Sequence, residues 1–159
     1  MRDEIKYLVR VSGDTASMVV VGKASYLNCR SAGDFFAAVS EKGCGKIVVD
    51  CLGCTGMDST FLGMIAGAAI RLRKTNGKLT LLNLNERNSE LIENLGLGKL
   101  VEIVDTSAPS EPEDAQTLPS SNATTSGILH AHESLIEADS ANKAKFEDVI
   151  AFLKKETKE

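Results

Sequence analysis

Tryptophan is absent from this 159-residue chain, and its aromatic residues are five Phe and two Tyr. So few rings weaken any interpretation based on base stacking or on a carbohydrate-binding platform. Clusters of basic side chains are missing as well and the net charge is −4, so the electrostatic footprint of a nucleic-acid-binding protein is not present. We therefore expect no nucleic-acid partner and a core built from aliphatic side chains.

Long apolar runs are also lacking. No window approaches the roughly 20 residues that a bilayer-spanning helix needs. The N-terminus, "MRDEIKYLVRVSGD", has no long apolar run behind its basic start, so it does not have the pattern of a signal peptide. We expect a cytoplasmic protein that does not insert into membranes.

The three prolines all lie between residues 105 and 127, together with nine Ser or Thr, four acidic residues and no basic residue. A segment of this composition cannot bury enough apolar surface to offset its ordering entropy, which is typical of a linker. The sequence therefore predicts a domain at 1–104, an acidic Pro/Ser/Thr-rich linker at 105–127 and a C-terminal helical appendage at 128–159.

Strand and helix patterns alternate within the predicted domain. Two β-branched runs around a Gly-Asp turn predict a hairpin, and later apolar runs next to glycines predict buried strands. Strand patterns cover 6–13, 17–24, 46–52, 78–84 and 99–104, and helical patterns cover 31–45, 61–74 and 85–98. This order predicts an α/β fold with a mixed, mainly parallel sheet of four to five strands, amphipathic helices and a C-terminal helical extension.

Helical periodicity returns after the linker, where Phe146, Val149, Ile150 and Leu153 form one apolar stripe. The run "ADSAN" interrupts the pattern and supplies an N-cap residue, so we expect a short helix followed by a longer one. An apolar stripe is stable only when it is covered. We therefore expect residues 128–158 to bury it on the domain or on a second copy of the chain, as a homodimer would.

The most informative stretch is "MDSTFLG", at the point where a strand pattern becomes a helix pattern. Asp58, Ser59 and Thr60 can each cap a helix, but a cap requires only one of them. A hydroxyl at this position is exposed, and a phosphate placed there meets unpaired N–H groups and the positive end of the helix dipole. For a docked partner, however, two added negative charges beside Asp58 would be repulsive. Such a site suits a switch.

The block from residue 46 to 100 resembles the STAS domain, the fold of bacterial anti-sigma factor antagonists. The similarity lies in "KIVVDCL", "GMDST" with its small-residue helix, "GKLTLLN" and "LGLGKL", and it extends over about residues 5 to 104. The resemblance implies a protein that is not an enzyme, has no cofactor and binds a protein serine kinase that is also the anti-sigma factor. A PP2C-type phosphatase is the second implied partner.

The same resemblance assigns roles to individual residues. Ser59 matches the phosphoacceptor, Thr60 is the secondary candidate, and Asp58 matches the acidic neighbour that shapes the site. Unphosphorylated protein would bind the kinase and free a sigma factor, and the phosphorylated form would let go. The implied partner-binding residues are Asp58, Ser59, Thr60, Phe61, Leu62 and Gly63. Many family members carry Gly where this chain has Phe61, so we expect its ring at the rim of the docking surface.

Other chemistries fit less well. Cys51 and Cys54 have redox spacing, but they precede Asp58 by several residues instead of opening the helix. A zinc site needs two further ligands, and neither the distant Cys29 and Cys44 nor the histidines in the appendage form a second close pair. We therefore expect no metal site.

A hydrolase with Ser59 as the nucleophile needs a general base, and the two histidines, His130 and His132, both lie in the appendage. We therefore expect no catalytic residues. The alternative function is a STAS accessory or scaffold module of a transport or stressosome-like complex, in which Ser59 is not modified.

Overall fold

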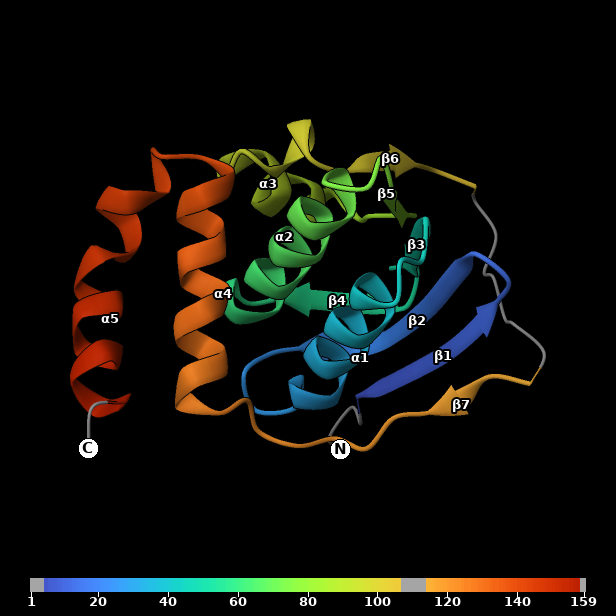
Figure 1. The fold of residues 1–159 in the computed structure, drawn as a ribbon, viewed down its shortest axis with the longest axis horizontal. Helices are drawn as coiled ribbons and strands as arrows, with labels where there is room; N and C mark the ends of the chain where they lie inside the picture. The colour runs from blue at the N-terminus through green and yellow to red at the C-terminus, as the bar shows by residue number, and fades with distance from the viewer. Residues whose placement is uncertain (1–4, 107–113, 158–159) are drawn as a thin grey trace.

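The β-branched runs near the N-terminus form the expected hairpin, and the later apolar runs extend it into one sheet (Figure 1). The computed structural model describes residues 5–106 and 114–157. Its strands are β1 (Lys6–Ser12), β2 (Thr15–Ala24), β3 (Lys46–Asp50), β4 (Cys54–Met57), β5 (Lys78–Leu82), β6 (Glu102–Val104) and β7 (Gln116–Thr117). Their order is β6-β5-β3-β2-β1-β7, with β4 paired to β2. The pairs β1–β2 and β1–β7 are antiparallel and the other pairs are parallel, which confirms the mixed, mainly parallel sheet.

The described part of the sheet has seven strands, two more than expected. The additional strands are β4 and β7, and their small or polar residues carry little strand signal. Both are held by a neighbour: β4 pairs with the end of β2, and the amide of Leu118, just after β7, donates to the Tyr7 carbonyl of β1. Pairing therefore creates these strands where local sequence does not specify them.

The helices are α1 (Arg30–Glu41), α2 (Ser59–Arg73), α3 (Glu86–Asn94), α4 (Thr125–Ala138) and α5 (Asn142–Thr157), with a short 3₁₀ turn, η1 (Leu97–Lys99). Figure 1 shows α1 and α2 in front of one face of the sheet, with α4 beside α2 and α5 outermost. Helix α2 is buried on almost every side, since the sheet, α1 and α4 all contact it. None of the helices in the described residues is both long and apolar enough to cross a membrane.

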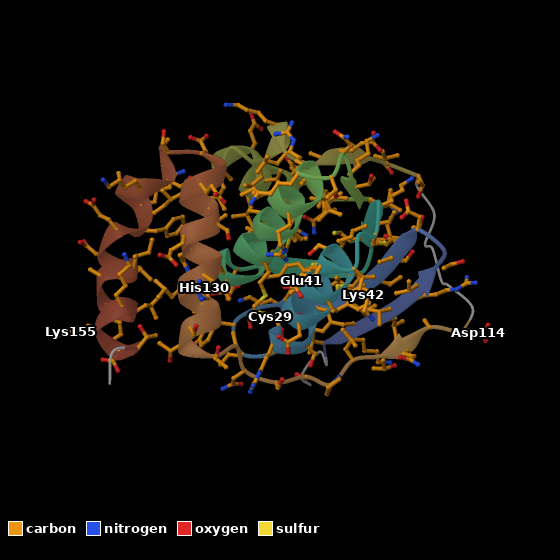
Figure 2. All side chains as sticks on the ribbon, in the orientation of Figure 1. Cys29, Glu41, Lys42, Asp114, His130 and Lys155 are labelled. Carbon is orange, nitrogen blue, oxygen red and sulfur yellow. The ribbon has the colours of Figure 1, made fainter. Side chains whose placement is uncertain are left out.

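The apolar stripe of α5 packs on α4. Ile150 and Leu153 are buried against Leu129, with Phe146 at the edge of this cluster, whereas Val149 is 41% exposed. Figure 2 shows His130 on α4 and Lys155 on α5, with α4 lying between α5 and the rest of the molecule. The stripe is thus covered mainly by the neighbouring helix of the appendage, and α4 in turn packs on the domain.

The segment that precedes α4 follows the surface of the domain. Besides β7, Ser121 bridges to Cys29, and the Ala123 amide donates to the Tyr26 carbonyl at 2.7 Å. The predicted domain boundaries stay a prediction, and parts of them (residues 1–4, 107–113 and 158–159) lie outside the described residues.

Asn142 joins the turn between α4 and α5 to the domain. Its buried Nδ2 donates to the Leu95 carbonyl at 2.9 Å and to the Leu135 carbonyl at 2.8 Å. Replacing Asn142 by Ala leaves both carbonyls without this donor, so we expect the free energy of unfolding to fall by about 1–3 kcal/mol. Urea denaturation followed by circular dichroism measures the loss. The exposed Asn122→Ala serves as the matched control, and equal stability of the two variants would contradict the expectation.

Candidate functional site

The site begins where β4 ends and α2 starts. Asp58 is in an extended conformation and is the N-cap of α2, since its Oδ1 accepts a hydrogen bond from the Phe61 amide at 3.0 Å. Its Oδ2 accepts from the Tyr26 amide at 2.8 Å. One carboxylate therefore fixes the first turn of α2 and the loop after β2, as the capping residue types in the sequence indicated.

Ser59 is the first residue of α2 and is half-buried. Its Oγ lies 2.9 Å from His132 Nε2, and the other ring nitrogen, His132 Nδ1, lies 2.7 Å from the Ile128 carbonyl oxygen. Because a carbonyl can only accept, the proton of the neutral ring sits on Nδ1, and Nε2 accepts the hydrogen bond that the Ser59 hydroxyl donates. The appendage thus reaches the expected phosphoacceptor directly.

His132 is buried in this position, with its ring edge-on to Phe146 at a centroid distance of 5.0 Å. The position of His132 in the appendage therefore does not keep it away from Ser59, contrary to what the sequence suggested. The two residues are 73 positions apart, and no motif in the sequence connects them. The pair differs from a Ser-His-Asp triad, because a backbone carbonyl and not a carboxylate orients the ring.

The residues after Ser59 point into the protein. The Phe61 ring is fully buried and lies 6.0 Å from the Tyr7 ring and 6.2 Å from the Phe36 ring, centroid to centroid. This corrects the expectation that Phe61 forms the rim of a docking surface. Thr60 and Leu62 are buried too, so the side chains of the expected binding stretch that remain partly accessible are those of Asp58 and Ser59.

Gly63 is the point of closest approach between α2 and α4. A β-carbon built on Gly63 would lie 2.7 Å from the β-carbon of Ala131 and closer still to the Ala131 carbonyl. One turn later, a β-carbon on Gly67 would lie 3.0 Å from Ser134 Oγ. The two glycines therefore allow α2 to pack closely against α4.

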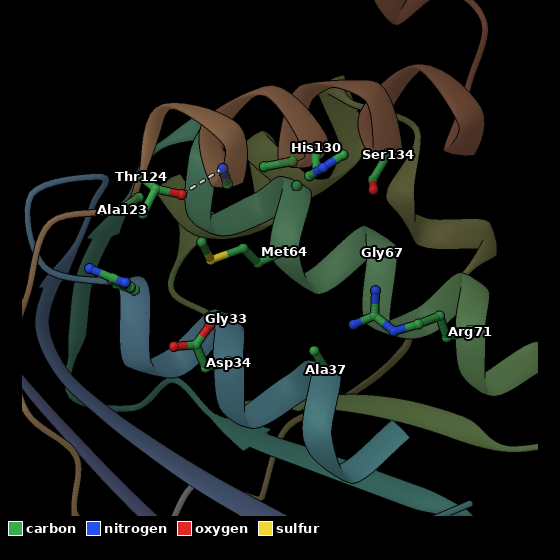
Figure 3. A pocket seen from close by; sticks show the side chains of 14 residues that line it. Gly33, Asp34, Ala37, Met64, Gly67, Arg71, Ala123, Thr124, His130 and Ser134 are labelled. Atoms are coloured by element: carbon green, nitrogen blue, oxygen red, sulfur yellow. Dashed lines mark hydrogen bonds between the residues drawn. The ribbon is translucent and has the colours of Figure 1, made fainter. Parts of the chain in front are cut away.

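A cavity of about 330 Å³ lies beside this contact, between α1, α2 and α4 (Figure 3). Met64 projects into it from α2, and Ser134 faces it from α4. Arg71 also lines it while its Nε donates to Ser40 Oγ at 2.8 Å, and burial lowers the pKa of Arg71, a shift that the nearby Glu41 opposes. Ser59 and His132 do not line this cavity.

The Cys-x-x-Cys pair lies within the core. Cys51 and Cys54 are buried free thiols, and burial raises the pKa of both. Their sulfurs lie near the carbonyls of Val49 and Gly56. A raised pKa disfavours the thiolate, so the pair lacks the activated sulfur that redox exchange needs. In residues 5–106 and 114–157, no three His, Cys, Asp or Glu side chains gather as a metal site would require.

The buried thiols make stability dependent on pH. Burial raises the pKa of Cys29 from its ordinary 9.0 to about 12, and the charge of Asp58 adds to the shift. The folded state holds the thiol proton longer than the unfolded chain, so this contribution to stability is complete below pH 9 and is lost as the pH rises towards 12. Burial raises the pKa of Tyr7 as well, which acts in the same direction.

We therefore expect the free energy of unfolding to fall above pH 9 through Cys29 and above pH 10 through Tyr7, by up to about 1.4 kcal/mol per pH unit for each group. Urea denaturation at a series of pH values measures this dependence. A Cys29→Ala variant should show a shallower fall than the unmodified protein. A stability that stays constant through this range would contradict the expectation.

A family model described as "Mlab, STAS domain" matches residues 8–102, which is more than half of the chain. The chain belongs to the STAS family. The matched region runs from β1 to the start of β6, so α4 and α5 of this STAS protein lie outside it. No curated protein matches the chain.

Solved structures share the STAS fold at low sequence identity. An anti-sigma factor antagonist from Mycobacterium paratuberculosis is 19% identical with a TM-score of 0.57, covering 65% of this chain and 88% of the other. Phosphorylated SpoIIAA from Bacillus is 20% identical with a TM-score of 0.54, covering 64% and 90%. A putative anti-sigma factor antagonist from Thermotoga maritima is 19% identical with a TM-score of 0.52, covering 63% and 86%. At these identities the likeness establishes the fold.

Proposed function

We propose that this STAS protein is a phosphorylation-switched anti-sigma factor antagonist with Ser59 as its phosphoacceptor. Unmodified, it binds a protein serine kinase that is also the anti-sigma factor, and so frees a sigma factor. Phosphorylation of Ser59 ends the complex, and a PP2C-type phosphatase restores it. The observation that carries the proposal is the position of Ser59, a half-buried hydroxyl at the first residue of a capped helix in a STAS domain.

Electrostatics support a switch at this position. A phosphate on Ser59 would lie at the N-terminus of α2, where the free N–H groups of the first turn and the helix dipole stabilise negative charge. Asp58 already occupies the Phe61 amide, and its charge faces any partner that docks there. The phosphate therefore costs the domain little, but it places additional negative charge against a docked partner.

Exposed apolar side chains in two loops of the domain support a protein partner. Tyr26 and Leu27, in the loop whose amide binds Asp58, are 48% and 56% exposed. Leu52, in the turn after β3, is 48% exposed. Large apolar side chains exposed beside a polar loop are typical of an interaction surface. These residues give the partner a contact area that α4 leaves open.

Incubation with ATP and candidate cognate kinases, followed by intact-mass measurement, tests the proposal. We expect one phosphate on the unmodified protein and on the control Ser126→Ala, whose hydroxyl is exposed at the start of α4. We expect none on Ser59→Ala. Thr60→Ala should still be phosphorylated, because the Thr60 side chain is buried. Phosphate on the Ser59→Ala variant, or on no variant with any cognate kinase, would refute the role of Ser59.

A second candidate is a STAS accessory or scaffold module in a transport or stressosome-like complex, in which Ser59 is not modified. Two observations favour it: the description of the matching family model, and the cover that α4 places over α2. Such a module would stay in its complex whatever the charge at position 59. Affinity purification from the host separates the candidates, because Ser59→Asp should abolish binding of an antagonist to its kinase and leave a scaffold complex unchanged.

A further inference from the structure

The face of α2 that leads away from Ser59 is shaped to receive a helix, and α4 occupies it. Gly63 and Gly67 lie one turn apart, and α4 approaches Gly63 with the backbone of Ala131 and Gly67 with the side chain of Ser134. Any β-carbon at Gly63 would collide with α4, since the three atoms nearest to it all belong to Ala131. The fit therefore depends on small residues in both helices.

Ser59 ends this face and is held by the same helix. The His132 ring that accepts its hydrogen bond is fixed by the Ile128 carbonyl and by Phe146. A phosphoryl group on Ser59 Oγ would replace the proton that the hydroxyl shares with His132 Nε2, and this hydrogen bond between Ser59 and the buried ring would be lost. Phosphorylation of Ser59 would therefore weaken the docking of α4 at this end of the contact.

The family match ends before α4: it spans residues 8–102, and α4 begins at Thr125. The three solved structures with the same fold match this chain over 63–65% of its length but over 86–90% of their own. Nearly all of each of those proteins is thus accounted for by the shared domain. Helix α4 therefore lies outside the part of the chain that the family model describes.

We propose that α4 is a displaceable cover: it occupies the helix-binding face of α2 and holds Ser59 through His132, and the partner reaches Ser59 by inserting a helix of the same kind in its place. Such a helix carries small residues at the two positions that face Gly63 and Gly67. The role of the partner rests on the proposed function. The helix-binding property of α2 does not, and it can be measured without a kinase.

Two substitutions test the two sides of the contact between α2 and α4, one on each helix. Ala131→Leu adds bulk to α4 and should displace it while the face of α2 stays intact. Gly63→Ala should also displace α4, but it leaves a β-carbon on the face itself. Ala144→Leu, at an exposed position of α5, is the matched control. Leu135→Glu, which places a charge in the buried contact, is a second variant for release.

The experiment uses the full chain and a fluorescent synthetic peptide of residues 122–157. The tethered α4 competes at an effective concentration in the millimolar range, so the unmodified protein and Ala144→Leu should bind the peptide at least about 10-fold more weakly than Ala131→Leu. Gly63→Ala should not bind it. Hydrogen exchange of the α4 amides, read by mass spectrometry, reports release and should accelerate in Ala131→Leu, Gly63→Ala and Leu135→Glu.

Three results would overturn the proposal. The first is equal peptide binding by the unmodified protein and Ala131→Leu. The second is a failure of Ala131→Leu and Leu135→Glu to bind the peptide although hydrogen exchange shows that α4 is released in both. The third is an α4 hydrogen exchange rate that is unchanged in both variants. If the kinase assay labels Ser59, Ala131→Leu should be labelled faster, and equal rates would also count against the cover. Failure of the kinase assay alone would refute the antagonist and leave the peptide result standing.

Discussion

Replacing Phe61 by alanine is expected to lower the free energy of unfolding by about 3–5 kcal/mol. The ring is fully buried and packs against the rings of Tyr7 and Phe36, which come from the sheet and from α1. Its removal leaves a cavity between these three elements, and two aromatic contacts are lost with it. The loss should therefore exceed that of any surface substitution in α2.

Urea denaturation followed by circular dichroism gives the free energy of unfolding of Phe61→Ala. The matched control is Phe152→Ala, because Phe152 on α5 is 61% exposed and its removal creates no cavity. A loss for Phe61→Ala no larger than that of the control would show that the ring is not part of the core. It would then restore a surface role for this residue.

Replacing Asp58 by alanine is expected to lower the free energy of unfolding by about 2–3 kcal/mol. The variant loses the cap on the Phe61 amide and, at the same time, the acceptor for the Tyr26 amide. Each amide loses a hydrogen bond to a charged group, which is worth more than one to a neutral group. Asp58→Asn retains one side-chain oxygen and should lose about half as much.

Thermal and urea denaturation of both Asp58 variants measure these effects, with the exposed Asp148→Ala on α5 as the control. The order of stability should be Asp148→Ala, Asp58→Asn, Asp58→Ala. If Asp58→Ala is as stable as the control, the carboxylate does not organise the start of α2. The acidic residue before Ser59 would then act only through its charge.

Periodic apolar patterns were sufficient to predict most of the fold. The runs that became β3, α2 and β5 have clear periods or continuous apolar character, and each forms its expected element. The residues 99–104 were expected to form one strand, but Gly96 adopts a left-handed φ of 68°, a 3₁₀ turn follows and only Glu102–Val104 pairs. Tertiary pairing decides such short segments.

The sequence predicts where the site lies, but it does not predict which side chains surround Ser59. Asp58 and Ser59 stand where capping chemistry placed them. The sequence does not tell an inward Phe61 ring from an outward one, because α2 is buried nearly all round and has no polar face for comparison. His132 was missed because a contact over 73 residues leaves no local signal.

The backbone of Tyr26 has a consequence for how the protein would respond to its own abundance. Its amide binds Asp58 at the start of α2, and its carbonyl binds Ala123 just before α4. Because α4 is anchored next to α2, its release and return are first-order processes within one molecule. The fraction of molecules with α4 released is therefore independent of protein concentration. Dilution would release α4 if it were docked on a second copy of the chain, whereas it would not change the docking of α4 within one chain.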